Sequence, residues 1–466
     1  MSTDFASRLP ALKLNKAGKP SVDYRQIVVL ALPLFLDSFT YIVIGLTDTW
    51  FISRISTDAT AAVGAINWLM FVFIMLFACI GVAVQTKVAQ AYGANKLAKA
   101  ARLTWTGLWV ALLTFPMYGA IALSGPFLLA PFGLDEHIEQ LALLYWLPRM
   151  LGGAIVVADW TLRGFFNAIN RTHLALIVSS LVCVLNIGFN ALFIFSFNWG
   201  VAGAAWAAVA AQSAGLILQL FLFLRPKMRQ SFRTDRTWKP RASLAGQLIN
   251  MGIFSGLFMV SDIVGLAFFQ MMQTQLGVAP GAATQIAITL LSLSYQPVVG
   301  VGEAGIILVG QSLGAGSRSW AKQVGNAVIR LSICYMVVVG VLLAIAGNWA
   351  ILPFVKSSNP DAAQVVSMAS SFLWIAALYQ FFHALTIAST FCLQGEEDVR
   401  FPAVLTIFLS LFVFVPVAHM LSFNAGEGFL SGLPSFGHGA FGGWWAYAGY
   451  LAILGSILWG RWRTIK

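Results

Sequence analysis

Charge is scarce in this chain: only 10% of its 466 residues are Asp, Glu, Lys or Arg, whereas 59% are hydrophobic. A soluble domain carries about 25% charged residues, which cover its surface. The shortage excludes a soluble enzyme of two or three domains, and the mean hydropathy of +0.81 agrees with that exclusion. The sequence therefore predicts a protein whose main solvent is lipid.

Cysteine is scarce as well, with four residues in the whole chain. All four lie in apolar runs, and no two of them form a CxxC pair. This pattern indicates neither a disulfide framework nor a cysteine metal site. Cys79, Cys183, Cys334 and Cys392 are expected to be small buried hydrophobic residues.

Acidic residues are outnumbered by basic ones, 17 against 28, which gives a net charge of +11. In a soluble protein this balance suggests nucleic acid, but cytoplasmic loops of membrane proteins also accumulate cations. With the N-terminus inside, twelve spans place all the cations on the cytoplasmic side except Arg54, Arg149 and Lys356. We therefore expect both termini to be cytoplasmic and no nucleic-acid partner.

Twelve apolar stretches are each long enough to cross a bilayer, which takes about 20 helical residues. They cover approximately residues 24–52, 59–85, 103–129, 141–167, 173–195, 201–224, 246–276, 282–309, 325–347, 367–393, 402–423 and 439–460. The predicted organisation is a cytoplasmic tail (1–23), a first lobe of six spans (24–224), a basic linker (225–245), a second lobe of six spans (246–460) and a cytoplasmic tail (461–466). The first apolar run is far longer than the core of a signal peptide, so we expect it to remain as the first span.

Internal repeats relate the two halves. Residues 88–94 (VAQAYGA) match 309–315 (VGQSLGA), 162–164 (LRG) match 393–395 (LQG), and 200–207 (GVAGAAWA) match 439–446 (GAFGGWWA). Because each half has six spans, equivalent helices run in the same direction. The fold class is therefore predicted as all-α and integral to the membrane, with two six-helix lobes related by a parallel pseudo-two-fold axis, an arrangement found in transporters.

Five acidic residues lie inside predicted spans, where a charge costs a few kcal/mol or more and marks a candidate functional site. They are Asp37, Asp48, Asp159, Asp262 and Glu303. Asp37 and Asp48 are eleven residues apart in the first span, so they share one helix face about 16 Å apart along the axis.

Hydroxyl groups flank Asp48, from Thr47 and Thr49. Such a carboxylate can bind Na⁺ or exchange a proton, and the plainer alternative is a paired structural acid near a helix end. Asp159 precedes Arg163 by four residues, which favours an ion pair within one helix.

The second half of the chain contains a different set of titratable residues inside its spans. Asp262 has no cation near it in sequence, Glu303 lies in the eighth predicted span and His383 in the tenth. A desolvated carboxyl group and an imidazole together suit proton exchange, although His383 alone is equally consistent with a packing role.

Residues 300–305 (GVGEAG) satisfy the spacing of a dinucleotide-binding loop. They lie inside an apolar span with no βαβ unit, so we interpret the glycines as sites of close helix approach.

Motifs in both halves resemble those of the multidrug and toxic compound extrusion (MATE) transporters of the MOP flippase superfamily, from about residue 27 to residue 459. The motifs are Pro33 with Asp48-Thr49, residues 88–94, Arg149, Asn186 with Asn190, residues 199–205 (WGVAGAA), residues 285–287 (QIA) and residues 309–315. The resemblance implies a twelve-helix, two-lobed antiporter that exports organic, often cationic, compounds against entering Na⁺ or H⁺.

The resemblance also implies roles for single residues. Asp48 falls on the family's coupling aspartate in the first span, and Asn186 on its asparagine in the fifth, so Asp48, Asn186 and Asn190 are a possible Na⁺ site. Two departures remove ligands: Asn190 stands where some members have a second aspartate, and Ala208 where they have a threonine. Both departures favour H⁺ over Na⁺ in this lobe.

In the second lobe, Asp262 falls where a NorM-type branch has an acidic cation ligand, and His383 where that branch has an aspartate. Histidine is a poor Na⁺ ligand, so this departure also favours protons. The expected coupling residues are Asp48, Asn186, Asn190, Asp37, Asp262, Glu303 and His383, and the expected substrate-cavity residues are Thr49, Phe269, Gln285 and Tyr379.

The sequence therefore predicts a secondary antiporter for small organic compounds, monomeric, in a bacterial inner membrane, with H⁺ or Na⁺ as coupling ion and no other cofactor. The nearest alternative is a lipid-linked oligosaccharide flippase of the same superfamily, which usually needs several cavity cations, and the spans offer only Arg149 and Arg163. An integral-membrane enzyme would need a nucleophile–base pair or a metal cluster, which the sequence does not suggest. A passive channel fits less well, because a parallel repeat with titratable groups at mid-span favours alternating access.

Overall fold

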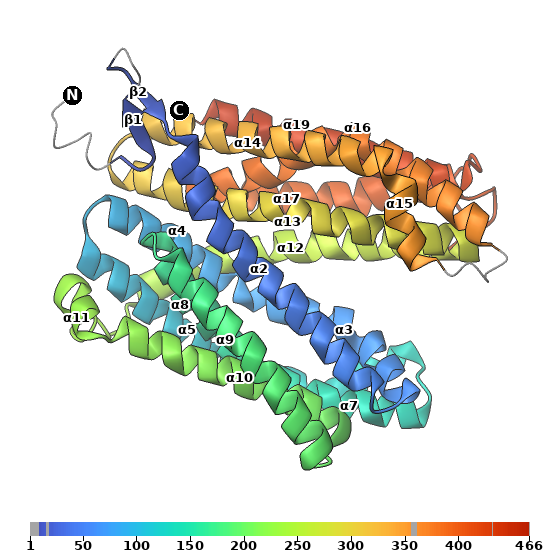
Figure 1. Cartoon of the computed structure of the whole chain (residues 1–466), viewed down its shortest axis with the longest axis horizontal. Helices are drawn as coiled ribbons and strands as arrows, with labels where there is room; N and C mark the ends of the chain where they lie inside the picture. Colours follow the sequence, from blue (N-terminus) through green and yellow to red (C-terminus); the bar gives the residue numbers. More distant parts are fainter. Residues whose placement is uncertain (1–8, 15–17, 356–360, 431, 466) are drawn as a thin grey trace. The chain divides into compact units, whose positions relative to one another are not determined.

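The computed structural model describes residues 9–14, 18–355, 361–430 and 432–465, and long helices dominate it (Figure 1). Within the described residues the only strands are β1 (Leu12–Leu14) and β2 (Pro20–Val22), an antiparallel pair that precedes the first long helix. Among the helix caps, Ser56 accepts a hydrogen bond from the backbone N–H of Ala59 (2.9 Å) and so fixes the start of the second long helix.

The long helices follow one another with short connections. They are α2 (Tyr24–Ser53), α3 (Thr57–Ala78), α4 (Ile80–Gly93), α5 (Leu97–Leu123), α7 (Glu136–Leu151), α8 (Gly153–Ala168), α9 (Thr172–Asn190), α10 (Gly200–Phe223), α12 (Ala242–Gln275), α13 (Val278–Gly314), α14 (Arg318–Ile345), α16 (Ala362–Gly395) and α19 (Gly439–Thr464). The shorter pieces are α6 (Gly125–Leu129), η1 (Ala130–Phe132), α11 (Pro226–Phe232), α15 (Gly347–Ile351), η3 (Leu352–Phe354), α17 (Arg400–Ile407), α18 (Val415–Ser422) and two π-helical segments, η2 (Ala191–Ser196) and η4 (Phe408–Phe414).

Eleven helical segments of the described chain are long and apolar enough to cross a membrane, and α7 with α8, bent by 42°, makes a twelfth as one span. The bend falls at Gly152, where the Val209 side chain leaves no room for a Cβ atom, one turn after Pro148. The predicted count of twelve is therefore confirmed. One boundary differs from the prediction. The third span begins at Leu97 rather than near residue 103, because the basic residues before 103 continue the helix.

The chain forms two compact units. The first consists chiefly of Leu36–Gly256 with Gly310–Ala321, and the second chiefly of Ala11–Phe35, Leu257–Val309 and Lys322–Lys466. In the first unit α4 packs against both α5 and α8, and α9 packs along α10. In the second unit α16 lies along α19, as Figure 1 shows in orange and red.

The two copies of the repeated motif meet inside the first unit. A Cβ atom at Gly93 would strike the backbone of Gln311, and one at Gly314 would strike the backbone of Gln90. The two contacts are reciprocal, since each glycine meets the glutamine of the other copy. Glycine permits this approach because it has no side chain, which is how small residues join helices in membranes. The repeat found in the sequence thus corresponds to a close contact between the ends of α4 and α13.

We predict that Gly93→Ala destabilises the protein by about 1–3 kcal/mol, because the new methyl group forces the ends of α4 and α13 apart. Thermal unfolding of the detergent-purified protein measures the change. Gly64→Ala is the matched control, since a Cβ atom at Gly64 meets nothing within 4 Å. Equal unfolding temperatures for the two variants would contradict the role assigned to this contact.

Candidate functional site

Asp48 forms a buried polar site with two asparagines in the first unit. Asn190 donates one hydrogen bond from Nδ2 to Asp48 Oδ1 (2.8 Å) and another to Asn186 Oδ1 (3.1 Å). Asp48 is 9% exposed, Asn186 1% and Asn190 0%. The structure thus brings Asp48 on α2 together with two asparagines at the end of α9 that lie far from it in sequence.

Local backbone geometry places Asn190 at this point. It is the last residue of α9, and the π-helical segment η2 begins at the next residue. A π-helical turn shifts the direction of the residues around it and recurs at functional sites. The matching helix of the second unit carries η4, in which the Ser410 hydroxyl donates to the backbone carbonyl of Ser261 (3.2 Å).

Arg149 gives the Asp48 site a positive charge. It lies on α7, close enough to Asp48 for an attractive electrostatic interaction, and its Nε atom is buried without a hydrogen-bond partner. Asn190 Oδ1 and Asn186 Nδ2 are buried without partners as well. The site therefore contains a charge pair and several unused polar atoms.

The same residues offer few ligands for Na⁺. Asp48 supplies a carboxylate and Asn190 Oδ1 is an unpartnered amide oxygen, but Asn186 Oδ1 already accepts from Asn190, and Ala208 supplies no side-chain oxygen. Within the part of the chain that the structure describes, no three His, Cys, Asp or Glu side chains gather around a possible metal position. The nearby Arg149 also opposes a bound cation.

Asp37 and Asp159 lie in a second polar cluster of the first unit, around Arg163. Arg163 Nη1 lies 3.2 Å from Asp37 Oδ2, and Arg163 Nη2 lies 3.0 Å from Asp159 Oδ2. The ion pair expected within α8 therefore exists, but it is part of a larger triad that also includes α2. Gln219 on α10 donates to Asp159 Oδ1 (2.6 Å).

Tyrosines surround the predicted acid of the second unit. Asp262 is exposed at the middle of α12, and its charge interacts with Tyr295, Tyr447 and Tyr450. His383 packs edge-on against Tyr295, with ring centroids 5.7 Å apart. Tyrosines inside apolar spans are the sequence signal that could have revealed this cluster.

Glu303 does not lie beside the rings of Tyr295 and His383. It is half-buried on α13, two helical turns beyond Tyr295, which is about 12 Å along the axis.

Two of the expected cavity residues lie in the packed core. Phe269 is 0% exposed, stacked on Tyr447 and edge-on to Trp444, so it does not line an open surface as expected. Tyr379 is also buried, because it packs against Tyr447. The other two, Thr49 and Gln285, are exposed.

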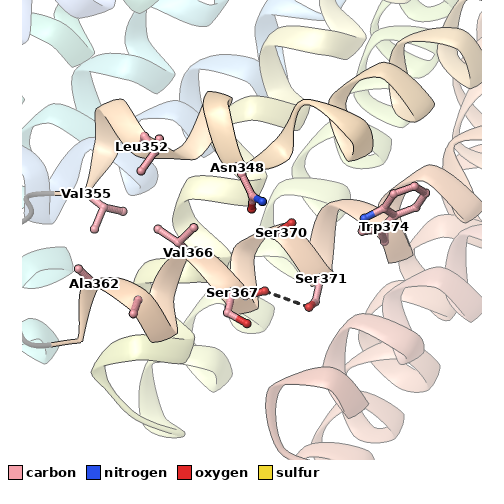
Figure 2. A pocket seen from close by; sticks show the side chains of 10 residues that line it. Asn348, Leu352, Val355, Ala362, Val366, Ser367, Ser370, Ser371 and Trp374 are labelled. Carbon is pink, nitrogen blue, oxygen red and sulfur yellow. Dashed lines mark hydrogen bonds between the residues drawn. The ribbon is translucent and has the colours of Figure 1, made fainter.

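A separate groove of about 840 Å³ opens in the second unit along α15, η3 and α16 (Figure 2). Its lining residues are Asn348, Leu352, Val355, Ala362, Ala363, Val366, Ser367, Ser370, Ser371 and Trp374. None of these described residues is charged, so the groove contributes no group that could exchange an ion.

Comparisons with known proteins show which sequences and folds this chain resembles. The profile of the MatE family matches residues 33–192 and 255–420. The probable multidrug resistance protein NorM of Burkholderia pseudomallei is 26% identical, over 93% of this chain and 91% of its own length. The probable multidrug resistance protein NorM of Pseudomonas aeruginosa is 28% identical, over 96% and 90%.

Solved structures share the fold. A MOP superfamily transporter from Pyrococcus furiosus has a TM-score of 0.81 at 19% identity, covering 94% of this chain and 95% of its own. A structure described as MATE in the bent conformation gives 0.83 at 18%, covering 94% of both chains. The predicted twelve-helix membrane fold is therefore confirmed.

We predict that Asn190→Ala destabilises the protein by about 1–3 kcal/mol, because Asp48 Oδ1 loses its donor in a buried site. Thermal unfolding in detergent tests this. Asn348→Ala, which removes an exposed amide on α15, is the control and should leave the unfolding temperature within error of the original. A shift no larger than that of the control would mean that the hydrogen bond does not stabilise the site.

Proposed function

This chain belongs to the MatE family, and from that membership we propose that it is a secondary antiporter that exports organic compounds in exchange for protons. Its curated relatives are named multidrug resistance proteins, over nine-tenths of this chain. The relatives are named as proteins of multidrug transport and not as enzymes, which supports the prediction that this chain is not an enzyme. The Asp48 site is the observation that supports proton coupling most directly.

Protonation of Asp48 changes the forces between three helices. The ionised carboxylate attracts Arg149 on α7 and accepts from Asn190 on α9. A proton on Asp48 cancels the attraction to Arg149 and weakens the hydrogen bond from Asn190. The two protonation states of α2 therefore have different preferred packings, and binding a proton shifts the population from one to the other.

The second unit supports an organic cation as substrate. Asp262 is exposed on α12, with three tyrosines close enough to interact with its charge. A carboxylate beside aromatic rings attracts positively charged organic groups through charge and cation–π interactions. We expect the protein to act as a monomer on such small compounds.

The flippase alternative has less support. A pyrophosphate group needs several free cations, but Arg163 is held by two carboxylates and is only 12% exposed at its side chain. Arg149 already interacts with Asp48. Neither Arg149 nor Arg163 is therefore free for a phosphate.

We predict that Asp48→Asn abolishes proton-driven efflux, because the amide cannot take up and release a proton. Proteoliposomes loaded with ethidium, a planar organic cation, and given a pH gradient alone or a Na⁺ gradient alone would measure this. Asp58→Asn, which changes an exposed aspartate on α3, is the control and should transport normally. Full transport by Asp48→Asn, or transport driven only by Na⁺, would overturn the proposal.

We also propose that the protein resides in the inner membrane of a bacterium with both termini in the cytoplasm, as the cation distribution favours. A green fluorescent protein fused after residue 466 should then fluoresce, whereas alkaline phosphatase fused there should be inactive. The reverse result would place the C-terminus outside. Fusions at exposed Gly133, between α6 and α7, should give the opposite pattern and serve as the control.

A further inference from the structure

Asp37, Arg163 and Asp159 form a buried triad that the coupling mechanism at Asp48 does not use. Asp37 is 2% exposed and Asp159 5%. The two terminal nitrogens of the guanidinium each contact a different carboxylate, Nη1 that of Asp37 at 3.2 Å and Nη2 that of Asp159 at 3.0 Å. The guanidinium also stacks over the Tyr41 ring, 4.4 Å from its centroid. One helix, α2, supplies Asp37 and Tyr41, and α8 supplies the other two charges.

The charges of the triad do not balance. With both carboxyl groups ionised, two negative charges face one positive charge. Among the described residues, Arg163 is the only salt-bridge partner of either aspartate, and Gln219, which reaches the triad from α10, is neutral. An excess negative charge buried at the depth of a membrane span is unfavourable by several kcal/mol unless something neutralises it.

Hydrogen bonding shows what the triad lacks. Asp159 is well supplied, since Gln219 donates to Oδ1 at 2.6 Å, and Arg163 and Tyr41 lie 3.0 and 3.4 Å from Oδ2. Asp37 Oδ1 is buried without any partner, and so is Gln219 Oε1. Both orphan atoms are acceptors, so the triad is short of a proton donor.

We propose that the Asp37–Arg163–Asp159 triad is a second proton-binding site, which takes up one proton and then carries no net charge. The proton belongs to the aspartate pair as a unit. The site is separate from Asp48, about 16 Å away along α2, and is built from α2, α8 and α10 rather than α2, α7 and α9. Its part in transport rests on the proton coupling proposed above, whereas proton binding itself does not.

Infrared difference spectra of the full-length protein in detergent, recorded between pH 9 and pH 5, test the proposal with protons as the only ligand. Carboxyl groups that bind a proton appear as a C=O band. Asp37→Asn should lose one carboxyl equivalent of this band, because the remaining Asp159 and Arg163 already balance. Asp159→Asn should lose the same amount, and Arg163→Gln should gain one, since two carboxylates then lack their cation.

Asp58→Asn controls for the loss of a carboxyl group elsewhere, and Asp48→Asn shows that the triad's band is not that of the coupling site. A band of unchanged area in both Asp37→Asn and Asp159→Asn would overturn the triad. The measurement needs no substrate and no gradient, so it separates the two proposals. Loss of the band alongside full proton-driven transport by Asp48→Asn would refute the function proposed for Asp48 and leave the triad intact.

Discussion

Lipid offers no hydrogen bond, so a polar side chain inside a span is stabilised by a partner from the protein itself. This constraint accounts for the arrangement of helices around α2. Asn190 from α9 reaches Asp48, and Arg163 from α8 reaches Asp37 on the same helix. These polar contacts join α2 to α8 and α9. Glycine contacts such as Gly93 with Gln311 then allow backbones elsewhere to approach closely.

The two acidic sites on α2 meet the constraint differently. Asp48 has one cation, Arg149, so its charge is matched when ionised. Asp37 shares its only cation with Asp159, so that group is matched only after one proton binds. A matched pair can lose its attraction on protonation, whereas an unmatched triad gains stability. One helix therefore carries two sites whose response to protons is opposite in sign.

Twelve spans, the repeat and the five intramembrane acids could be predicted from the sequence, because hydropathy and the scarcity of charge are local properties. The pair of Asp159 with Arg163 could be predicted too, since it lies within one helix. The partners that come from other helices could not. Helical periodicity predicts which face of its helix Asp37 lies on, but it does not predict which other helix packs against that face. The ion pair between Asp37 and Arg163 could therefore not be predicted. Phe269 is predicted to line a cavity but lies in the core, because sequence alone does not distinguish an aromatic residue in a core from one in a cavity.

The triad lies close to the point where α2 passes from the second compact unit to the first. Residues up to Phe35 belong to the second compact unit, and residues from Leu36 onward belong to the first. Asp37 is thus the first charged residue of α2 within the first unit. In the second unit, the backbone of α2 at Phe35 lies very close to Gly300 of α13. A Cβ atom added at Gly300 would clash with it. A proton that changes the ion pair between Arg163 and Asp37 therefore acts on α2 two residues beyond a point where the helix backbone is closely packed, so a change in this ion pair can alter how α2 packs.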